Sequence, residues 1–261
     1  MSRTRPSGAP RKPRISGERR TILVELAYNG EAFHGLAPQA GLTTVSSTLK
    51  AALEQHFALP AQGLTFAART DAGVSALQNF ATVSLRATRD LAAEVATLAA
   101  LRLADLEVKS AVLVDRRVNA RTYANSKHYR YRVSCTPEPA HRTWALGSAL
   151  DVKRMQTAAE FLLGTHDFSA FRAANCGSKN PTKQLTRVEV TQHQHVVQID
   201  IEGNSFLRRM MRIISGSLIE VGTGVRPTES IRELLLTGDR SAAGVTAPAC
   251  GLELVSVSLS G

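Results

Sequence analysis

The chain has 261 residues, of which 43% are hydrophobic and 21% charged, and its formal net charge is +10. This composition is typical of a globular protein long enough for one large core or two modest ones. No apolar run approaches the roughly 20 residues that cross a bilayer, so we expect no membrane-spanning helix and no membrane partner.

Positive charge is concentrated at the start of the chain, where residues 1–20 hold seven basic side chains and one acidic one. Pro6, Pro10 and Pro13 prevent a continuous helix, and the apolar run of a secretory signal is absent. We therefore expect residues 1–19 to be a disordered basic tail. Its expected partner is a polyanion, and the alternative is a leader that only aids solubility.

The spacing of apolar residues predicts the elements in chain order. Residues 21–28 alternate between apolar and other side chains, which indicates a half-buried strand, and apolar residues four apart over 45–57 indicate a helix. The first half continues with strands 64–68 and 79–85, a helix 91–102 and a strand 107–114. The second half repeats the order with strand 128–134, helix 152–163, strands 185–191 and 196–202, helices 205–222 and 230–236, and strand 253–259.

This repeated order predicts an α/β (α+β) fold with two tandem ferredoxin-like βαββαβ subdomains, residues 20–117 and 118–261. The two mixed or antiparallel sheets are expected to form a central basic cleft where they meet, because a junction between subdomains is a common location for a ligand site. The long connections 31–44 and 165–183 are candidates for loops beside that cleft.

A carboxylate at a strand end is the first candidate for chemistry. Residues 67–76 read Ala-Ala-Arg-Thr-Asp-Ala-Gly-Val-Ser-Ala, so Asp71 follows an apolar strand and precedes turn residues. Arg69 is a nearby cation that favours the ionised form of the acid. Without further context, an aspartate before Ala-Gly more often stabilises its own turn.

The segment resembles the signature of the tRNA pseudouridine synthase A family, Gly-Arg-Thr-Asp-x-Gly-Val-His-Ala. The match includes Arg69, Thr70, Asp71, Gly73, Val74 and Ala76, whereas Ala68 and Ser75 replace the usual glycine and histidine. The resemblance implies that Asp71 is the catalytic nucleophile or base and that the family's homodimer is retained. It also implies tRNA as the substrate, with target uridines at positions 38 to 40 of the anticodon stem-loop.

A second candidate segment, residues 119–131, reads Asn-Ala-Arg-Thr-Tyr-Ala-Asn-Ser-Lys-His-Tyr-Arg-Tyr. Strand alternation puts Tyr129 and Tyr131 on one face and Arg130 and Arg132 on the other. This pattern suits a nucleic-acid binder, because bases stack on rings and phosphates pair with guanidinium groups. The alternative is an ordinary core strand with an exposed charged face.

The second segment also resembles the family, which has an Ala-Arg block followed by a Tyr-x-Tyr strand. The resemblance implies that Tyr129 contacts the target nucleotide and that Arg121 binds substrate. Asn119 and Lys127 depart from the usual histidine and arginine.

The third candidate is the helix expected over 205–222, with Asn204 or Ser205 as its N-cap. A helical wheel gathers its apolar residues on one face and puts Arg208 and Arg212 on the other. Two cations four residues apart repel, so an anionic partner is expected, although a solvated face is the alternative. By resemblance to the family's helix, Arg212 pairs with the catalytic aspartate, and Arg208 is a substrate-binding candidate.

Other signals predict structure rather than chemistry. His166 and Asp167 lie in a block similar to the family's Gly-x-His-Asp-Phe, and loop capping is a commoner role for them than acid-base chemistry. Residues 193–195, His-Gln-His, are expected to form a hairpin turn, and residues 222–224, Gly-Thr-Gly, to end a helix. The three cysteines are too widely spaced for a disulfide framework or zinc site, which fits a reducing cytoplasm. No metal and no cofactor are predicted.

The main hypothesis is therefore an isomerase that makes pseudouridine. The target uridine leaves its stem, Arg69 fills the vacated space, and Tyr129 packs against the flipped uracil. Leu36 and Pro38 stand where the family has a tryptophan and an arginine, so the second hypothesis is a non-catalytic or weakly active paralogue that binds or helps fold structured RNA. A small-molecule enzyme or regulatory module on a ferredoxin-like scaffold is the third.

Overall fold

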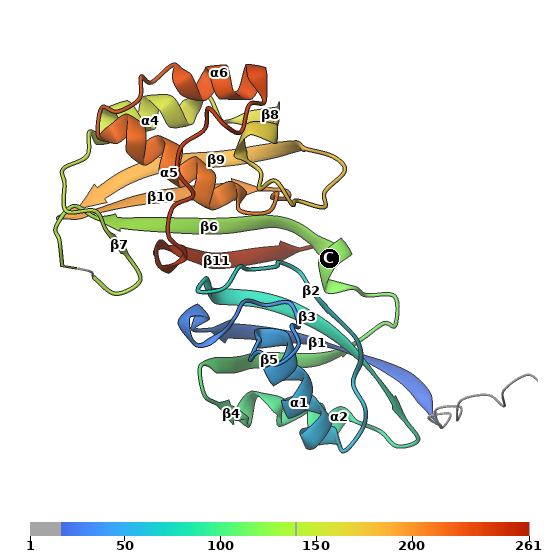
Figure 1. Cartoon of the computed structure of the whole chain (residues 1–261). Coiled ribbons are helices and arrows are strands. Elements are labelled where there is room, and N and C mark those ends of the chain that lie inside the picture. Colours follow the sequence, from blue (N-terminus) through green and yellow to red (C-terminus); the bar gives the residue numbers. More distant parts are fainter. Residues whose placement is uncertain (1–16, 139, 261) are drawn as a thin grey trace, which may run out of the picture.

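The computed structural model of the chain describes residues 17–138 and 140–260 (Figure 1). The predicted tail, 1–19, lies mostly outside the described residues, and Glu18 and Arg19 are the first residues of strand β1. None of the described helices combines the length and hydropathy needed to cross a bilayer.

The first half contains the predicted strand-helix order, with three short additions. Its main elements are β1 (Glu18–Tyr28), α1 (Val45–Phe57), β2 (Gln62–Phe66), β3 (Ser75–Ala87), α2 (Ala92–Ala96) and β5 (Leu106–Val114). The additions are the 3₁₀ turns η1 (Gly30–Ala32) and η2 (Leu98–Ala100) and the short strand β4 (Arg102–Leu103). The single helix predicted over 91–102 is wrong, because α2 ends after five residues and η2 follows it.

The second half repeats the order and adds edge strands. Its main elements are β6 (Ala124–Ser134), α4 (Val152–Glu160), β9 (Thr182–His193), β10 (Val196–Gly203), α5 (Met210–Gly222), α6 (Ser230–Thr237) and β11 (Leu252–Leu259). The shorter elements are α3 (Ala120–Tyr123), β7 (Trp144–Ala145), β8 (Gly164–Asp167), η3 (Ser169–Phe171) and η4 (Ala249–Gly251). β8 lies in the connection 165–183 that was expected to be loop.

The ferredoxin-like prediction is confirmed by the strand order. The four main strands of the first half lie in the order β5-β1-β3-β2, and those of the second half in the order β11-β6-β10-β9. When the main strands of each half are numbered one to four along the chain, both halves have the same spatial order, 4-1-3-2. Every adjacent pair within these two sets is antiparallel.

The two sheets are continuous rather than separate. β3 pairs with β11 in parallel, with Ser75 opposite Glu253 and Ala76 opposite Leu254, and this contact makes one sheet of eleven strands (Figure 1). β2 occupies the remaining part of the same edge of β3. The loop 67–74, which connects β2 to β3 and contains Asp71, therefore lies at the junction of the two halves. The basic cleft expected there stays a prediction.

The start of α5 differs from its prediction. The helix begins at Met210 instead of residue 205, and its N-cap is Arg209 rather than Asn204 or Ser205. Arg209 has φ 61°, a left-handed conformation that cannot continue a right-handed helix. Arg208 therefore lies in the turn before the helix and not on the same helical face as Arg212.

Candidate active site

Asp71 lies in a tight turn between β2 and β3. The backbone N–H of Val74 donates to the carbonyl of Asp71 at 3.2 Å, and Gly73 supplies the positive φ of 80° that the turn requires. The Asp71 side chain is 28% exposed, which leaves its carboxylate accessible from one side. Arg69, two residues earlier, is exposed.

A buried hydrogen-bond network holds the strand-to-loop transition before Asp71. The amide of Asn79, which is fully buried, accepts from the backbone N–H groups of Ala68 and Phe80 and donates to the carbonyl of Ala68. It also donates to the hydroxyl of Tyr28 at 3.3 Å, and that hydroxyl lies 2.9 Å from the hydroxyl of Thr70. Burial raises the pKa of Tyr28 to about 12, although both hydrogen bonds act to lower it. Tyr28 is therefore a neutral structural group at physiological pH.

The segment after β1 supports the other side of the loop. The backbone N–H of Leu36 donates to the carbonyl of Thr70 at 3.1 Å, and that of Gly30 donates to the Ser75 hydroxyl at 2.9 Å. A Cβ atom at Gly30 would lie 2.2 Å from the carbonyl of Val74, so only glycine permits this approach. The loop is thus fixed on both sides by backbone contacts.

Arg212 reaches Asp71 from the other half of the chain. It lies in the first turn of α5, and its Nη1 atom is 3.4 Å from Oδ2 of Asp71. Its Nε atom donates to the carbonyl of Ala247 at 2.6 Å, and the backbone N–H of Ala247 donates back to the Arg212 carbonyl at 3.1 Å. The Arg212 side chain is 15% exposed, and its guanidinium is oriented by two partners, so it presents a fixed positive charge to the carboxylate.

Tyr129 lies beside this ion pair. Its side chain is buried on β6, and its ring packs edge-to-face on Phe206 with a centroid separation of 5.0 Å. Burial raises the pKa of the Tyr129 hydroxyl, and the charges of Tyr28 and Asp71 raise it further. In the sheet register, Tyr129 is opposite Leu254 of β11, and Leu254 is opposite Ala76 near the start of β3. Because the Asp71 loop leads directly into β3, Tyr129 lies at the same junction as the Asp71–Arg212 pair.

The other three predicted substrate-binding residues are exposed on separate segments. Arg69 is in the Asp71 loop, Arg121 is in α3, and Arg208 is in the turn before α5. No hydrogen bond or ion pair among the described residues joins their side chains to Asp71 or Arg212. Their roles stay predictions.

Comparisons with known proteins identify the relationship. A family profile described as tRNA pseudouridine synthase matches residues 158–259, a stretch that contains Arg212 but not Asp71. tRNA pseudouridine synthase A of Geotalea uraniireducens is 39% identical over 242 residues, which are 91% of this chain and 99% of that protein. The chain belongs to the tRNA pseudouridine synthase A family.

Two further relatives show similar identity over similar shares of the chain. The synthases A of Pseudomonas aeruginosa and Shouchella clausii are each 38% identical, over 92% and 90% of this chain and over 86% and 92% of their own lengths. Among solved structures, the archaeal box H/ACA sRNP Nop10-Cbf5 complex covers 87% of this chain and 49% of that chain at 12% identity. The TM-score of this match is 0.36.

Three departures from the tRNA pseudouridine synthase A pattern, at Leu36, Ser75 and Asn119, have structural roles. Leu36 is buried, so an apolar side chain remains where the family has tryptophan, and Pro38 is exposed. Ser75 accepts the hydrogen bond from Gly30, and the Asn119 side chain caps α3 by accepting from the backbone N–H of Arg121 at 3.0 Å.

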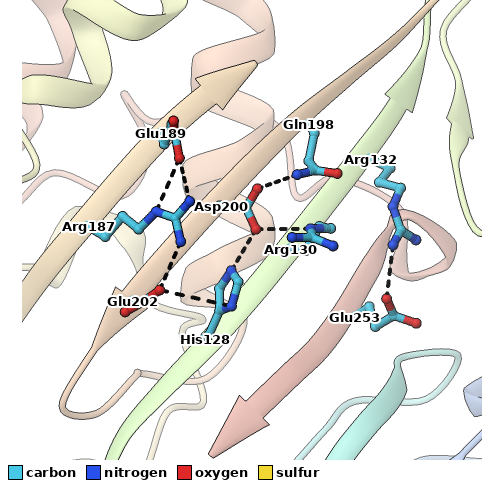
Figure 2. Close-up of polar contacts among 9 residues, drawn as sticks. All are labelled: His128, Arg130, Arg132, Arg187, Glu189, Gln198, Asp200, Glu202 and Glu253. Carbon is cyan, nitrogen blue, oxygen red and sulfur yellow. Dashed lines mark hydrogen bonds and ion pairs between the residues drawn. The ribbon is translucent and has the colours of Figure 1, made fainter. Parts of the chain in front are cut away.

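The cationic face of β6 is already neutralised. Figure 2 shows Arg130 directed at Asp200, which also accepts from His128 and Gln198, and Arg132 directed at Glu253. Asp200 and Glu253 are each 2% exposed. The paired guanidinium groups favour the core-strand alternative for this face over phosphate binding, while Tyr129 remains on the face that meets Asp71.

The predictions for three turn and loop segments are confirmed. His166 contacts the carbonyl of Leu163 at 2.7 Å, and Asp167 accepts from the backbone N–H of Ser169 at 2.7 Å, as loop capping requires. Residues 193–195 turn between β9 and β10, with Gln194 at φ 54°, and α5 ends at Gly222. The described residues contain no group of three or more histidine, cysteine or acidic side chains suited to a metal ion.

Sequence reasoning missed the groups that orient the site. Tyr28, Thr70 and Asn79 fix the loop, and the carbonyl of Ala247 fixes Arg212. Asn79 had a detectable signal, since an amide inside an apolar strand needs a partner. A backbone carbonyl 35 residues from its donor leaves no trace in the sequence.

Proposed function

We propose that the chain is a tRNA pseudouridine synthase, an isomerase that converts uridine to pseudouridine without a cofactor. The observation that carries this proposal is the contact of 3.4 Å between Asp71 and Arg212. It supports a reactive carboxylate that is accessible, held by a cation and adjacent to an aromatic ring. Membership of the tRNA pseudouridine synthase A family supports the same reaction.

The reaction breaks the C–N glycosidic bond of uridine, turns the base and joins its C5 to the same sugar carbon. Substrate and product are isomers, so neither an oxidant nor ATP is consumed. The Asp71 carboxylate acts as nucleophile or base, and Arg212 pairs with it and orients it. Tyr129 provides a neutral surface against which the uracil packs, since its hydroxyl stays protonated.

The three exposed arginines bind and open the RNA in this proposal. A uridine inside a stem must leave the stack, which costs a few kcal/mol, and Arg69 occupies the space that it vacates. Arg121 and Arg208 contact phosphate groups on either side of the flipped nucleotide. Their exposure and their lack of an ion pair among the described residues support this role.

We also propose that the target is the anticodon stem-loop of tRNA. The protein acts as a homodimer in the cytoplasm. Its three cysteines are unpaired, which is consistent with a reducing compartment. The subdomains 20–117 and 118–261 act together, because Asp71 lies in one and Arg212 in the other. Pseudouridine mapping on a set of tRNAs tests the target, and light scattering tests the dimer.

The test of the activity is Asp71→Asn, incubated with unmodified tRNA. The variant is expected to bind tRNA but to form no pseudouridine, because the amide is neither a nucleophile nor a base. Asp151→Asn is the matched control, since asparagine caps α4 as well as aspartate does. Pseudouridine formation by Asp71→Asn at the unaltered rate would remove Asp71 from the mechanism. A wild-type chain that binds tRNA tightly and modifies no base would support the non-catalytic alternative.

A further inference from the structure

Four arginines surround a hollow at the end of the first subdomain that is remote from Asp71. Its volume is about 570 Å³, and Arg19, Arg86, Arg116 and Arg117 line it together with Gly17 and Glu18. We call these four residues the arginine cluster. They come from the start of β1, the end of β3 and the segment that follows β5.

The arginine cluster has no anionic partner among the described residues. Glu18 forms its ion pair with Arg20, at 2.9 Å. Asp115 accepts from the backbone N–H of Arg117 at 2.8 Å and forms no described ion pair. Each member of the cluster is exposed, in contrast to Arg130 and Arg132, which are neutralised by buried carboxylates (Figure 2).

The arrangement places like charges against each other. Arg19 and Arg86 are direct cross-strand neighbours in the register of β1 and β3, and like charges in that position are destabilising. The preceding chain cannot relieve the repulsion, because residues 1–17 contain no acid. A cluster that repels itself and faces an open hollow suits a partner with several negative charges.

We propose that the arginine cluster binds phosphate groups of the RNA substrate at a second position, well away from the reacting uridine. Guanidinium groups recognise phosphate by paired hydrogen bonds, and several of them fit a sugar-phosphate backbone better than a single small anion. This inference rests on the proposed function, which supplies RNA as the substrate.

Strand geometry sets the separation between the two positions. Ser75, at the Asp71 end of β3, and Arg86 are eleven residues apart, which is about 36 Å at about 3.3 Å per residue. At about 3.4 Å per base pair, an RNA helix that spans this separation needs about eleven base pairs. An isolated anticodon stem-loop with a much shorter stem, bound at Asp71, therefore does not reach the arginine cluster, whereas whole tRNA is long enough.

The test compares Arg116→Gln/Arg117→Gln with the wild-type full-length chain. With whole tRNA, the slope of log affinity against log salt is expected to fall by about 2, so that the affinity lost between about 50 and 200 mM salt becomes about tenfold smaller. KM for whole tRNA is expected to rise with kcat unchanged. With an isolated anticodon stem-loop, neither quantity is expected to change.

Two further variants complete the design. Arg19→Gln/Arg86→Gln removes the other pair of the cluster and is expected to give the same result. Arg232→Gln, an exposed arginine on α6 in the other subdomain, is the matched control and is expected to leave the salt dependence unchanged.

An unchanged salt slope with whole tRNA in both double variants would overturn the inference. An equal loss with the isolated stem-loop would overturn it as well, because the cluster would then lie beside the reacting uridine. The binding measurements do not depend on turnover. A wild-type chain without pseudouridine activity would refute the proposed function and leave the test of the cluster intact.

Discussion

Asp71 and Arg212 are 141 residues apart in sequence, belong to different subdomains, and approach each other to 3.4 Å. The parallel pairing of β3 with β11 makes this contact geometrically possible, because it brings the start of β3 beside the second sheet. The Asp71 loop immediately precedes β3, and the segment containing Ala247, which binds Arg212, precedes β11. The ion pair therefore depends on the continuity of the eleven-stranded sheet.

The first prediction distinguishes the roles of Arg208 and Arg212, the two candidate arginines near the start of α5. Arg212→Ala is expected to lower kcat by about a hundredfold or more with little change in tRNA affinity, because a preorganised charge at the reacting group is lost. Arg208→Ala is expected to raise KM with kcat nearly unchanged, as for a residue that contacts phosphate. Steady-state kinetics on tRNA checks both. A loss of affinity alone in Arg212→Ala would mean that this arginine serves phosphate and not Asp71.

Lysine should not replace Arg212. One ammonium group cannot reproduce the planar fork that reaches Ala247 through Nε and Asp71 through Nη1. Arg212→Lys is therefore expected to remain much less active than wild type although the charge is kept. Full activity in this variant would show that charge alone suffices.

The second prediction concerns the network behind the Asp71 loop. Asn79→Ala is expected to lower the free energy of unfolding by about 2–4 kcal/mol, because it leaves the buried N–H and carbonyl of Ala68 without their partner, removes an acceptor of the Phe80 N–H and leaves the Tyr28 hydroxyl with Thr70 alone. It should also lower kcat, since the loop loses its anchor. Asn125→Ala, at an exposed position of β6, is the control and is expected to change stability by at most about 0.5 kcal/mol. Urea denaturation and kinetics on the same samples provide the measurements.

The parts of the fold that the sequence predicted are those that depend on local patterns of apolar residues. The strand-helix order could be read because Ile22, Val24 and Leu26 alternate, and helix α1 because its apolar residues recur every four positions; both are local patterns. The start of α5 was placed five residues too early, because residues 205–209 carry a helix-compatible pattern. The left-handed Arg209 that prevents a helix there has no sequence signature.

Contacts between residues that are far apart in the sequence could not be predicted from local patterns. The segment of β8 was predicted to be part of a loop, because residues 164–167 are few and mostly polar. They form a strand only through their pairing with β9. The neutralisation of Arg130 and Arg132 depends on Asp200 and Glu253, which are 70 and 121 residues away. The roles of Asp71, Arg212 and Tyr129 were found through resemblance to a family. Composition and spacing alone favoured a turn for Asp71 and a core strand for Tyr129, and for Arg212 they left open both an anionic partner and a solvated face.

The third prediction tests the backbone approach behind the loop. Gly30→Ala places a Cβ atom 2.2 Å from the Val74 carbonyl and 2.6 Å from the Ser75 nitrogen, so the start of β3 must move. We expect a loss of about 1–3 kcal/mol in stability and a fall in kcat. Gly177→Ala, where a Cβ meets nothing within 4 Å, is the control and is expected to be nearly neutral. Thermal denaturation of both variants measures the difference in stability. Equal melting temperatures would mean that the start of β3 moves to accommodate the Cβ atom at no cost in stability.

The fourth prediction concerns the Cys176 thiol. Partial burial acts to raise its pKa, but backbone N–H groups of Ser178 and Arg208 and the charges of Arg172 and Arg208 outweigh that effect and lower it. Since the thiolate is the reactive form, alkylation of Cys176 should reach its half-maximal rate at a lower pH than in the urea-unfolded chain.

The measurement of Cys176 uses Cys135→Ser/Cys250→Ser, which leaves one thiol, and iodoacetamide labelling read by mass spectrometry. Arg172→Gln in that background is expected to move the midpoint upward, because one of the stabilising charges is removed. A midpoint identical in the folded and unfolded chains would contradict the assignment.

The fifth prediction concerns acid stability and Asp200. Burial acts to raise the Asp200 pKa, but hydrogen bonds from His128 and Gln198 and the charge of Arg130 outweigh burial and hold that pKa below its ordinary value. A carboxyl group with a lower pKa in the folded state stabilises the fold above the unfolded value of about 3.9. That contribution is lost as the pH falls through the lower, folded value.

Asp200→Asn is therefore expected to behave differently at the two ends of the pH range. At pH 7 it should be less stable than wild type by about 2–4 kcal/mol, because Arg130 and His128 lose their shared anion. Below the unfolded value of about 3.9 this stabilisation of the wild type decreases, and it is lost once the pH falls through the lower, folded pKa of Asp200, so the difference between the two chains should narrow. Urea denaturation from pH 7 to pH 3 measures the difference, with Asp151→Asn as a control that should change stability at pH 7 by at most about 0.5 kcal/mol. A gap that stays constant across the range would mean that the Asp200 charge does not stabilise the fold, and that the asparagine acts only through altered packing.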